Sequence, residues 1–73
     1  MSTKYNVAIA GATGNVGREI IQILEDKDFP IDQLYLLASS RSKGRIIEFR
    51  GEELVVGDLA EFDFSKVQIG LFS

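Results

Sequence analysis

Three glycines between an apolar segment and an amphipathic segment constrain the fold of this chain more than any other feature. Tyr5–Ala10 alternates β-branched or aromatic residues with small ones, as in a strand that is buried on both faces. The segment ends at Gly11, and Gly14 and Gly17 follow at three-residue intervals. From residue 15 to residue 26, apolar side chains recur at helical spacing on one side: Val16, Ile20, Ile21, Ile23 and Leu24. The sequence therefore predicts a strand, a glycine-rich turn and an amphipathic helix.

The next apolar segment indicates that this strand belongs to a parallel sheet. Residues 34–38 are continuously apolar, which is typical of a strand covered on both faces. Residues 27–32 contain a proline and predict the loop that returns the chain from the helix. We expect an α/β fold with a Rossmann-like parallel sheet, in which a βαβ unit carries the glycine-rich loop.

The second half of the chain predicts a short hairpin and one more strand. Residues 46–49 and 53–56 flank a polar triplet at the spacing of a hairpin. Residues 57–65 predict a loop with one helical turn at most, and residues 67–72 a buried strand. A single helix cannot cover both faces of such a sheet, so we expect residues 1–73 to be an incomplete domain.

Composition excludes several functions for these 73 residues. They include no cysteine and no histidine, which leaves no disulfide, zinc finger, thiol nucleophile or imidazole base. The net charge of −3 argues against non-specific nucleic-acid binding, because phosphate neutralisation needs an excess of Lys and Arg. No apolar run approaches the ~18 residues of a membrane span, and no signal sequence precedes the first strand. We expect a cytoplasmic protein with no nucleic-acid or membrane partner.

The glycine-rich loop has the position and spacing of a phosphate-binding turn. Gly11 allows a sharp turn out of the strand, Gly14 lets the backbone approach a pyrophosphate, and Gly17 would let the helix pack closely on the sheet. The backbone N–H groups of residues 13–16 would then face the anion with the helix dipole behind them. The alternative is a tight turn without a ligand, but the strand before and the helix after favour dinucleotide binding. The expected contacts are Gly11, Thr13, Gly14, Asn15 and Val16.

The loop after the second strand indicates which dinucleotide is bound. NAD-binding domains usually carry an acidic residue there for the ribose hydroxyls, but this chain has serines and an arginine. A carboxylate would repel a 2′-phosphate, whereas an arginine and hydroxyls can hold it by charge-assisted hydrogen bonds. The sequence therefore predicts NADP, bound by Ser39, Arg41 and Ser42. The alternative is a solvated polar loop, and we expect Lys43 and Arg45 to be exposed charges.

Two other groups of residues have simpler interpretations. The acidic residues between 52 and 63 could suggest a cation site, but their spacing does not match an EF-hand, so we expect a solvated face and no metal. Tyr5, Tyr35 and the five phenylalanines fall mostly in or beside the predicted strands. We expect them in the core rather than at a stacking surface.

Three segments of this sequence occur together in one enzyme family. They are GATGNVG at residues 11–17, ASSRSKG at residues 38–44 and IGLFS at residues 69–73. In combination they resemble the start of the aspartate-semialdehyde dehydrogenases, and the resemblance runs through the whole chain. It implies an NADP-dependent enzyme that reduces L-4-aspartyl phosphate to L-aspartate 4-semialdehyde, in the synthesis of diaminopimelate, lysine, threonine and methionine.

The resemblance also implies roles for individual residues. The pyrophosphate would be carried by residues 13–16 and the 2′-phosphate by Arg41 and Ser42, and Ser73 would approach the cofactor. The catalytic cysteine, the acid/base histidine and the substrate-binding arginine of the family would lie beyond residue 73, so no catalytic residue is expected here. Residues 1–73 would be the N-terminal fragment of an NADP-binding Rossmann domain, without the catalytic and dimerisation domain of a homodimer. Two alternatives stay open: an N-acetyl-glutamyl-phosphate reductase and a non-catalytic NADP-sensing module.

Overall fold

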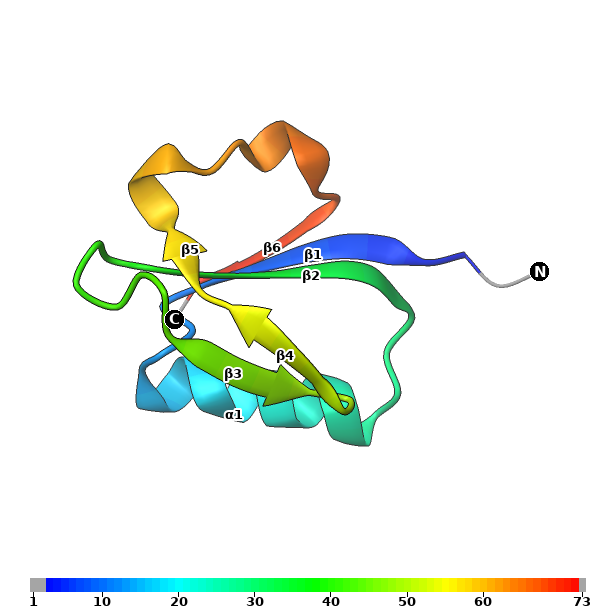
Figure 1. Cartoon of the computed structure of the whole chain (residues 1–73). Coiled ribbons are helices and arrows are strands. Elements are labelled where there is room, and N and C mark those ends of the chain that lie inside the picture. The colour runs from blue at the N-terminus through cyan, green and yellow to red at the C-terminus, as the bar shows by residue number, and fades with distance from the viewer. Residues whose placement is uncertain (1–2, 73) are drawn as a thin grey trace.

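The computed structural model describes residues 3–72 and contains a four-stranded parallel sheet and a two-stranded hairpin (Figure 1). The elements in chain order are β1 (Tyr5–Ala10), α1 (Asn15–Asp26), β2 (Ile31–Ala38), β3 (Ile46–Phe49), β4 (Glu52–Val55), β5 (Gly57–Asp58), the 3-10 turns η1 (Leu59–Glu61) and η2 (Phe64–Lys66), and β6 (Ile69–Phe72). The strand order in the sheet is β5-β2-β1-β6. This is the order of the first strands of a doubly wound nucleotide-binding sheet, so the predicted α/β fold is confirmed.

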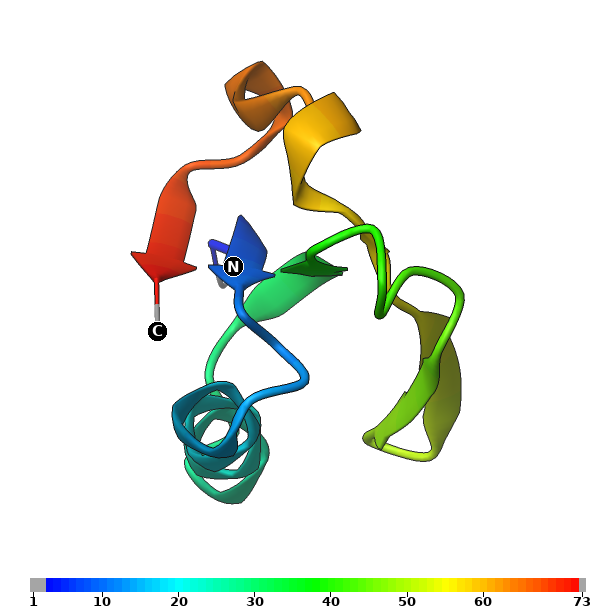
Figure 2. The ribbon, with the colours of Figure 1, turned by 90° about the vertical axis from the view of Figure 1, so that its left-hand side faces the viewer.

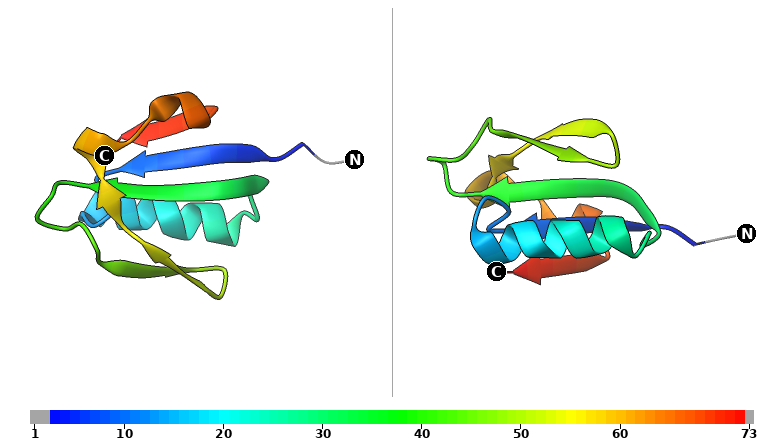
Figure 3. Two further views of the ribbon diagram at one scale, coloured as in Figure 1. Left: turned by 45° about the horizontal axis from the view of Figure 1, so that its top comes forward. Right: turned by 90° about the horizontal axis from the view of Figure 1, so that it is seen from below.

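Both faces of the sheet are covered at β1. Residues 7–10 are at most 4% exposed. On one face, Ile21 and Leu24 of α1 and Phe49 of the hairpin form one cluster with Ile9 and Leu36 of the sheet. The segment that contains η1 and η2 crosses the opposite face (Figure 2). Because β1, β2 and β6 are parallel, their carboxyl ends lie at one edge of the sheet, where α1 begins (Figure 3).

Helix α1 has the predicted boundaries but a narrower buried face. Gly17, Ile21 and Leu24 are buried. Val16 and Ile23, which the periodicity placed on the apolar side, are 57% and 55% exposed. The reason is that no second α-helix lies beside this flank of α1 in residues 3–72. Within residues 3–72, none of the helices has the length and apolar composition of a membrane span.

Strand β2 begins earlier than predicted. It starts at Ile31, opposite Tyr5 of β1, so the end of the predicted loop belongs to the sheet. Asp32 and Gln33 are exposed in this part of the strand. Strand β5 pairs only with the last residues of β2, so the first half of β2 has a solvent-facing edge that tolerates polar side chains. The apolar pattern in the sequence predicted only the second half of β2, residues 34–38, which is the more buried half.

The hairpin is present with a tighter turn than predicted. Phe49 of β3 pairs with Glu52 of β4, so only Arg50 and Gly51 connect the strands. Both residues have positive φ, 51° and 81°, the combination of a type I′ turn that matches the twist of a hairpin. Val56, expected in the second strand, follows β4 and is fully buried.

The segment between the hairpin and the last strand contains more regular structure than the predicted loop. Strand β5 extends the parallel sheet beside β2, and η1 and η2 follow it. Asp58 and Asp63 cap these turns, each accepting a backbone N–H two residues ahead at 2.9 and 3.0 Å. Strand β6 begins at Ile69 and not at residue 67. Two-residue strands and single 3-10 turns are too short to produce a hydrophobic period.

The aromatic side chains divide between the core and the surface. Phe49 is buried, and Tyr35 and Phe62 are half-buried. Phe64 and Phe72 are 37% and 69% exposed, so the core position predicted for these two is wrong. Ring contacts run from Tyr35 through Phe62 and Phe64 to Phe72, with centroid separations of 5.0, 5.0 and 5.9 Å. The outer rings are exposed because β6 is an edge strand in the described part of the sheet.

Candidate cofactor-binding site

The turn after β1 is held by backbone hydrogen bonds to the end of β2. Gly11 has φ of 80°, a conformation that glycine adopts without strain. The N–H groups of Gly11 and Ala12 donate to the carbonyl oxygen of Leu37 at 2.9 and 3.0 Å. The Gly14 N–H donates to the Gly11 carbonyl at 3.0 Å. The chain thus turns sharply into α1, as the glycine pattern predicts, but nothing in the sequence identified Leu37 as the anchor.

Gly17 permits a close approach between α1 and this turn. A Cβ at position 17 would lie 2.1 Å from the carbonyl oxygen of Gly11 and 2.9 Å from the Cα of Ala12. Both neighbours are backbone atoms and cannot move without opening the turn. The close packing predicted for Gly17 is therefore present, although its partner is the turn of residues 11–14, the glycine turn, and not the strand.

Gly14 has no comparable packing requirement. Its backbone is extended, with φ of −80° and ψ of 170°, which any residue can adopt. A Cβ at this position would lie 3.5 Å from the Gly11 carbonyl oxygen, an ordinary van der Waals separation. Gly14 is exposed at the start of α1. A glycine that the chain itself does not need fits a position that a ligand approaches closely.

The first turn of α1 presents hydrogen-bond donors without acceptors. No side chain caps the helix, and within residues 3–72 no acceptor is found for the N–H groups of Asn15, Val16 and Gly17. The first N–H to find a partner is that of Arg18, which donates to the Gly14 carbonyl at 3.0 Å. The first turn also contains no acidic residue that would compensate the positive end of the helix dipole. This turn can therefore bind an anion such as a pyrophosphate.

An open cavity of about 480 Å³ lies in front of the first turn of α1. Its position is the carboxyl edge of the sheet, where doubly wound folds bind their ligands. Phe72, the last described residue of β6, pairs with Ala10 at this edge, and Ser73 lies outside the described residues. The cavity is lined by Ala38 and by six of the predicted cofactor residues: Gly11, Thr13, Gly14, Asn15, Val16 and Ser39.

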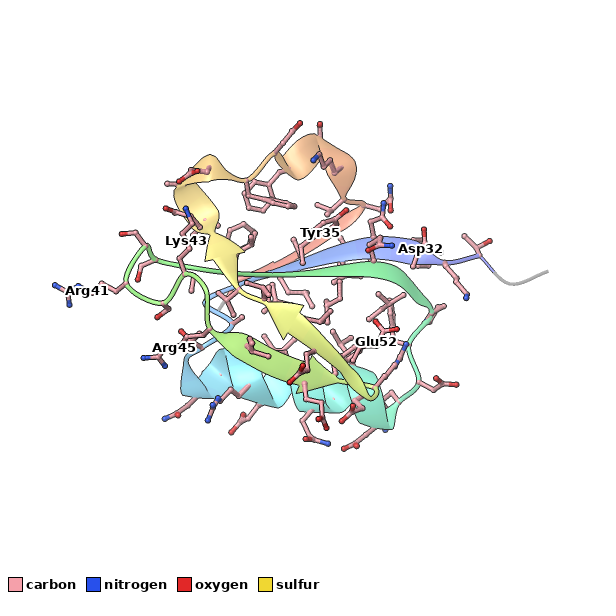
Figure 4. The ribbon with its side chains drawn as sticks, viewed as in Figure 1. Asp32, Tyr35, Arg41, Lys43, Arg45 and Glu52 are labelled. Atoms are coloured by element: carbon pink, nitrogen blue, oxygen red, sulfur yellow. The ribbon has the colours of Figure 1, made fainter. Side chains whose placement is uncertain are left out.

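A side-chain hydrogen bond joins the polar loop after β2 to the glycine turn. The Thr13 hydroxyl donates to Ser42 Oγ at 3.3 Å, and both residues are half-buried. Arg41 is exposed, has no side-chain partner among the described residues and extends away from the ribbon (Figure 4). Lys43 and Arg45 are both exposed, as predicted, and Lys43 also pairs with Glu61 at 3.5 Å. The structure thus joins Ser42 to Thr13 of the cavity lining and leaves the Arg41 side chain exposed.

The base of this loop is fixed by the hairpin. The Gly44 N–H donates to the Val56 carbonyl at 2.8 Å, and the Val56 N–H donates to the Arg45 carbonyl at 2.7 Å. The sequence did not mark Val56 as a residue that holds the loop. Residues 3–72 contain no group of three or more His, Cys, Asp or Glu side chains that could hold a metal ion.

Comparison with known proteins assigns the chain to a family. A model of the semialdehyde dehydrogenase NAD-binding domain matches residues 6–73. The chain belongs to this family. The glycine turn, the first turn of α1 and the cavity therefore lie in a domain that binds a nicotinamide dinucleotide.

The relatives extend the similarity over the whole chain. Aspartate-semialdehyde dehydrogenase of Legionella pneumophila is 60% identical over 73 residues, which are 100% of this chain and 21% of the relative. A USG-1 protein homolog of Azotobacter vinelandii is 47% identical over 100% of this chain and 22% of its own length. The crystal structure of aspartate semialdehyde dehydrogenase II from Vibrio cholerae, complexed with ASA, is similar with a TM-score of 0.95 and 48% identity, over 97% of this chain and 23% of that one. The chain thus spans about a fifth of the length of these relatives.

Proposed function

We propose that residues 1–73 are the N-terminal part of the NADP-binding domain of an aspartate-semialdehyde dehydrogenase. The complete protein would reduce L-4-aspartyl phosphate to L-aspartate 4-semialdehyde and inorganic phosphate with NADPH, as a homodimer in the cytoplasm. The observation that carries this proposal is the first turn of α1, where unpartnered N–H groups lie behind the exposed Gly14. The 60% identity to the enzyme of Legionella pneumophila supports the choice of substrate.

The polar loop supports NADP as the preferred dinucleotide. Residues 39–44 contain no carboxylate that would repel a 2′-phosphate. Arg41 is exposed without a side-chain partner in the described residues, so its guanidinium is available for a charge-assisted pair with the phosphate. Ser42 lies beside the glycine turn through its bond with Thr13, and Ser39 lines the same cavity. Ser73 is proposed as a further cofactor contact on the resemblance alone.

The composition of residues 1–73 indicates which part of the proposed reaction they would perform. When bound, NADPH supplies the hydride that reduces the acyl carbon. Residues of this chain would bind the cofactor, with the first turn of α1 at the pyrophosphate and the loop after β2 at the 2′-phosphate. Acyl transfer in this proposal uses a thiol nucleophile and an imidazole, and residues 1–73 contain neither cysteine nor histidine. The catalytic groups would therefore come from outside residues 1–73.

An activity assay of the complete protein tests this proposal. NADPH oxidation should depend on L-4-aspartyl phosphate, and residues 1–73 alone should show no turnover above background. Oxidation with N-acetyl-glutamyl phosphate as the preferred substrate would instead identify the related reductase. NADPH binding without turnover of either substrate would identify a non-catalytic sensing module, and both results would contradict the proposed activity.

A further inference from the structure

A side-chain hydrogen bond joins the two loops that the proposed function assigns to different phosphates of the cofactor. It runs from Thr13 in the glycine turn to Ser42 in the loop after β2, at 3.3 Å between the oxygen atoms. The residues are 29 positions apart in the sequence. Both are half-buried and Thr13 lines the cavity, whereas Arg41 beside Ser42 is exposed. The bond therefore holds the Ser42 hydroxyl beside a residue of the cavity lining.

This bond leaves the Ser42 hydroxyl able to contact a ligand. With Thr13 as the donor to Ser42 Oγ, the Ser42 hydroxyl keeps its own proton available for donation. A hydroxyl that already accepts a hydrogen bond is polarised and becomes a stronger donor. A phosphate has only acceptor oxygens at neutral pH, so a donating Ser42 hydroxyl matches a 2′-phosphate.

We propose that Thr13 is a positioning residue for NADP selection, which acts by orienting the Ser42 hydroxyl toward the 2′-phosphate. This inference rests on the proposed function, because it requires that the loop after β2 receives that phosphate. It gives the side chain of Thr13 a role different from that of its backbone, which belongs to the pyrophosphate turn. A side chain that only touches the pyrophosphate would serve NADP and NAD equally, whereas one that acts through Ser42 serves NADP alone.

Dissociation constants of the complete protein for NADP and NAD, at fixed ionic strength, test the inference. Thr13→Val removes the hydroxyl and keeps the branched shape. A neutral hydrogen bond accounts for about a 2- to 13-fold change in affinity, so we expect a loss in this range for NADP and less than about 2-fold for NAD. Thr13→Ser should restore NADP binding. In a double-mutant cycle, Thr13→Val should add no loss to Ser42→Ala, because its effect passes through Ser42.

Control variants distinguish an effect of the Thr13 hydroxyl from other causes of altered binding. Thr3→Val makes the same change at an exposed position outside the site and should leave both constants unchanged. If Thr13→Val unfolds, Thr13→Ala removes the same hydroxyl with a smaller side chain and gives the same comparison. Equal losses for NADP and NAD, or no loss for either, would overturn the inference. If Arg41→Ala also fails to weaken NADP binding selectively, the proposed NADP preference itself is wrong. If Arg41→Ala weakens NADP binding selectively while Thr13→Val has no effect, only the role of Thr13 is refuted.

Discussion

Alanine substitutions should distinguish Gly14, which we expect a ligand to approach closely, from Gly17, which the packing of the chain requires. Gly17→Ala would place a Cβ 2.1 Å from the Gly11 carbonyl oxygen, a separation that folded chains do not accommodate without backbone movement. Overpacking costs about 1–3 kcal/mol, and a clash with backbone atoms lies at the upper end of this range; the better helix propensity of alanine offsets about 1 kcal/mol. We expect Gly17→Ala to lower the free energy of unfolding by about 2 kcal/mol.

The same change at Gly14 should leave stability almost unchanged. Its Cβ would lie 3.5 Å from the nearest backbone atom, and its φ of −80° is open to alanine. The entropic gain from removing a glycine, about 0.4–1 kcal/mol, is offset by the poor N-cap propensity of alanine. Gly14 lines the cavity, however, so the added methyl would reduce the space at the proposed ligand position. We expect Gly14→Ala to weaken NADP and NAD binding alike by about 5- to 150-fold, which corresponds to about 1–3 kcal/mol of overpacking against the ligand.

Two measurements on the complete protein check this pair of variants. Urea-induced unfolding gives the stability of each variant, and isothermal titration calorimetry gives the dissociation constants for NADP and NAD. Binding of both dinucleotides by Gly14→Ala at the affinity of the unmodified protein would refute the ligand approach at Gly14. A loss of stability in Gly14→Ala equal to that in Gly17→Ala would refute the difference in packing.

Three further changes test other parts of the structure. Arg50→Ala removes a guanidinium that donates to the Leu24 and Phe29 carbonyls at 3.0 and 2.8 Å. Urea-induced unfolding should show that this lowers the free energy of unfolding by about 1–3 kcal/mol, against less than about 0.5 kcal/mol for the exposed control Arg45→Ala. Equal losses in the two variants would contradict this expectation. Hydrogen bonds from the Ser65 hydroxyl and N–H hold the pKa of Asp63 below its ordinary value, so the stabilisation is present above the unfolded pKa and is lost as pH falls through the folded pKa. Ser65→Ala should raise this pKa in an NMR titration, and an unchanged pKa would refute the assignment. Residues 1–73 alone should be marginally stable or self-associating, because Val16, Ile23, Ile46, Val55 and Phe72 are each more than half exposed; sharp cooperative unfolding of a monomer would argue against this.

The parts of the site that the sequence predicted are those determined by local chemistry. A buried strand, three spaced glycines and an amphipathic helix fix β1, the turn and α1, because each signal lies within a few residues of the structure it produces. The turn at Gly11 and the close packing of Gly17 follow from conformational freedom and the absence of a Cβ. These features needed no knowledge of the rest of the chain.

The features that were not predicted depend on contacts between distant segments. Strand β5 consists of two residues that are extended only because the end of β2 is available for pairing. Arg50 adopts a positive φ that its residue type disfavours, and bonds to the end of α1 and to the Glu25 carboxylate offset this cost. The contact between Thr13 and Ser42 requires two loops to meet, and no local pattern reports on such a meeting.

The most direct test of the proposed cofactor site is a pair of dissociation constants for Arg41→Ala in the complete protein. A hydrogen bond to a charged group contributes about 1.5–3 kcal/mol, so NADP binding should weaken roughly 10- to 150-fold. NAD binding should stay nearly unchanged, because only NADP carries the phosphate that Arg41 is proposed to hold. Arg41→Lys should recover part of the affinity, since it keeps the charge but loses the two-pronged donor. The measurement is made at fixed ionic strength because exposed charges are screened by salt. Equal losses for the two dinucleotides, or none, would contradict the account.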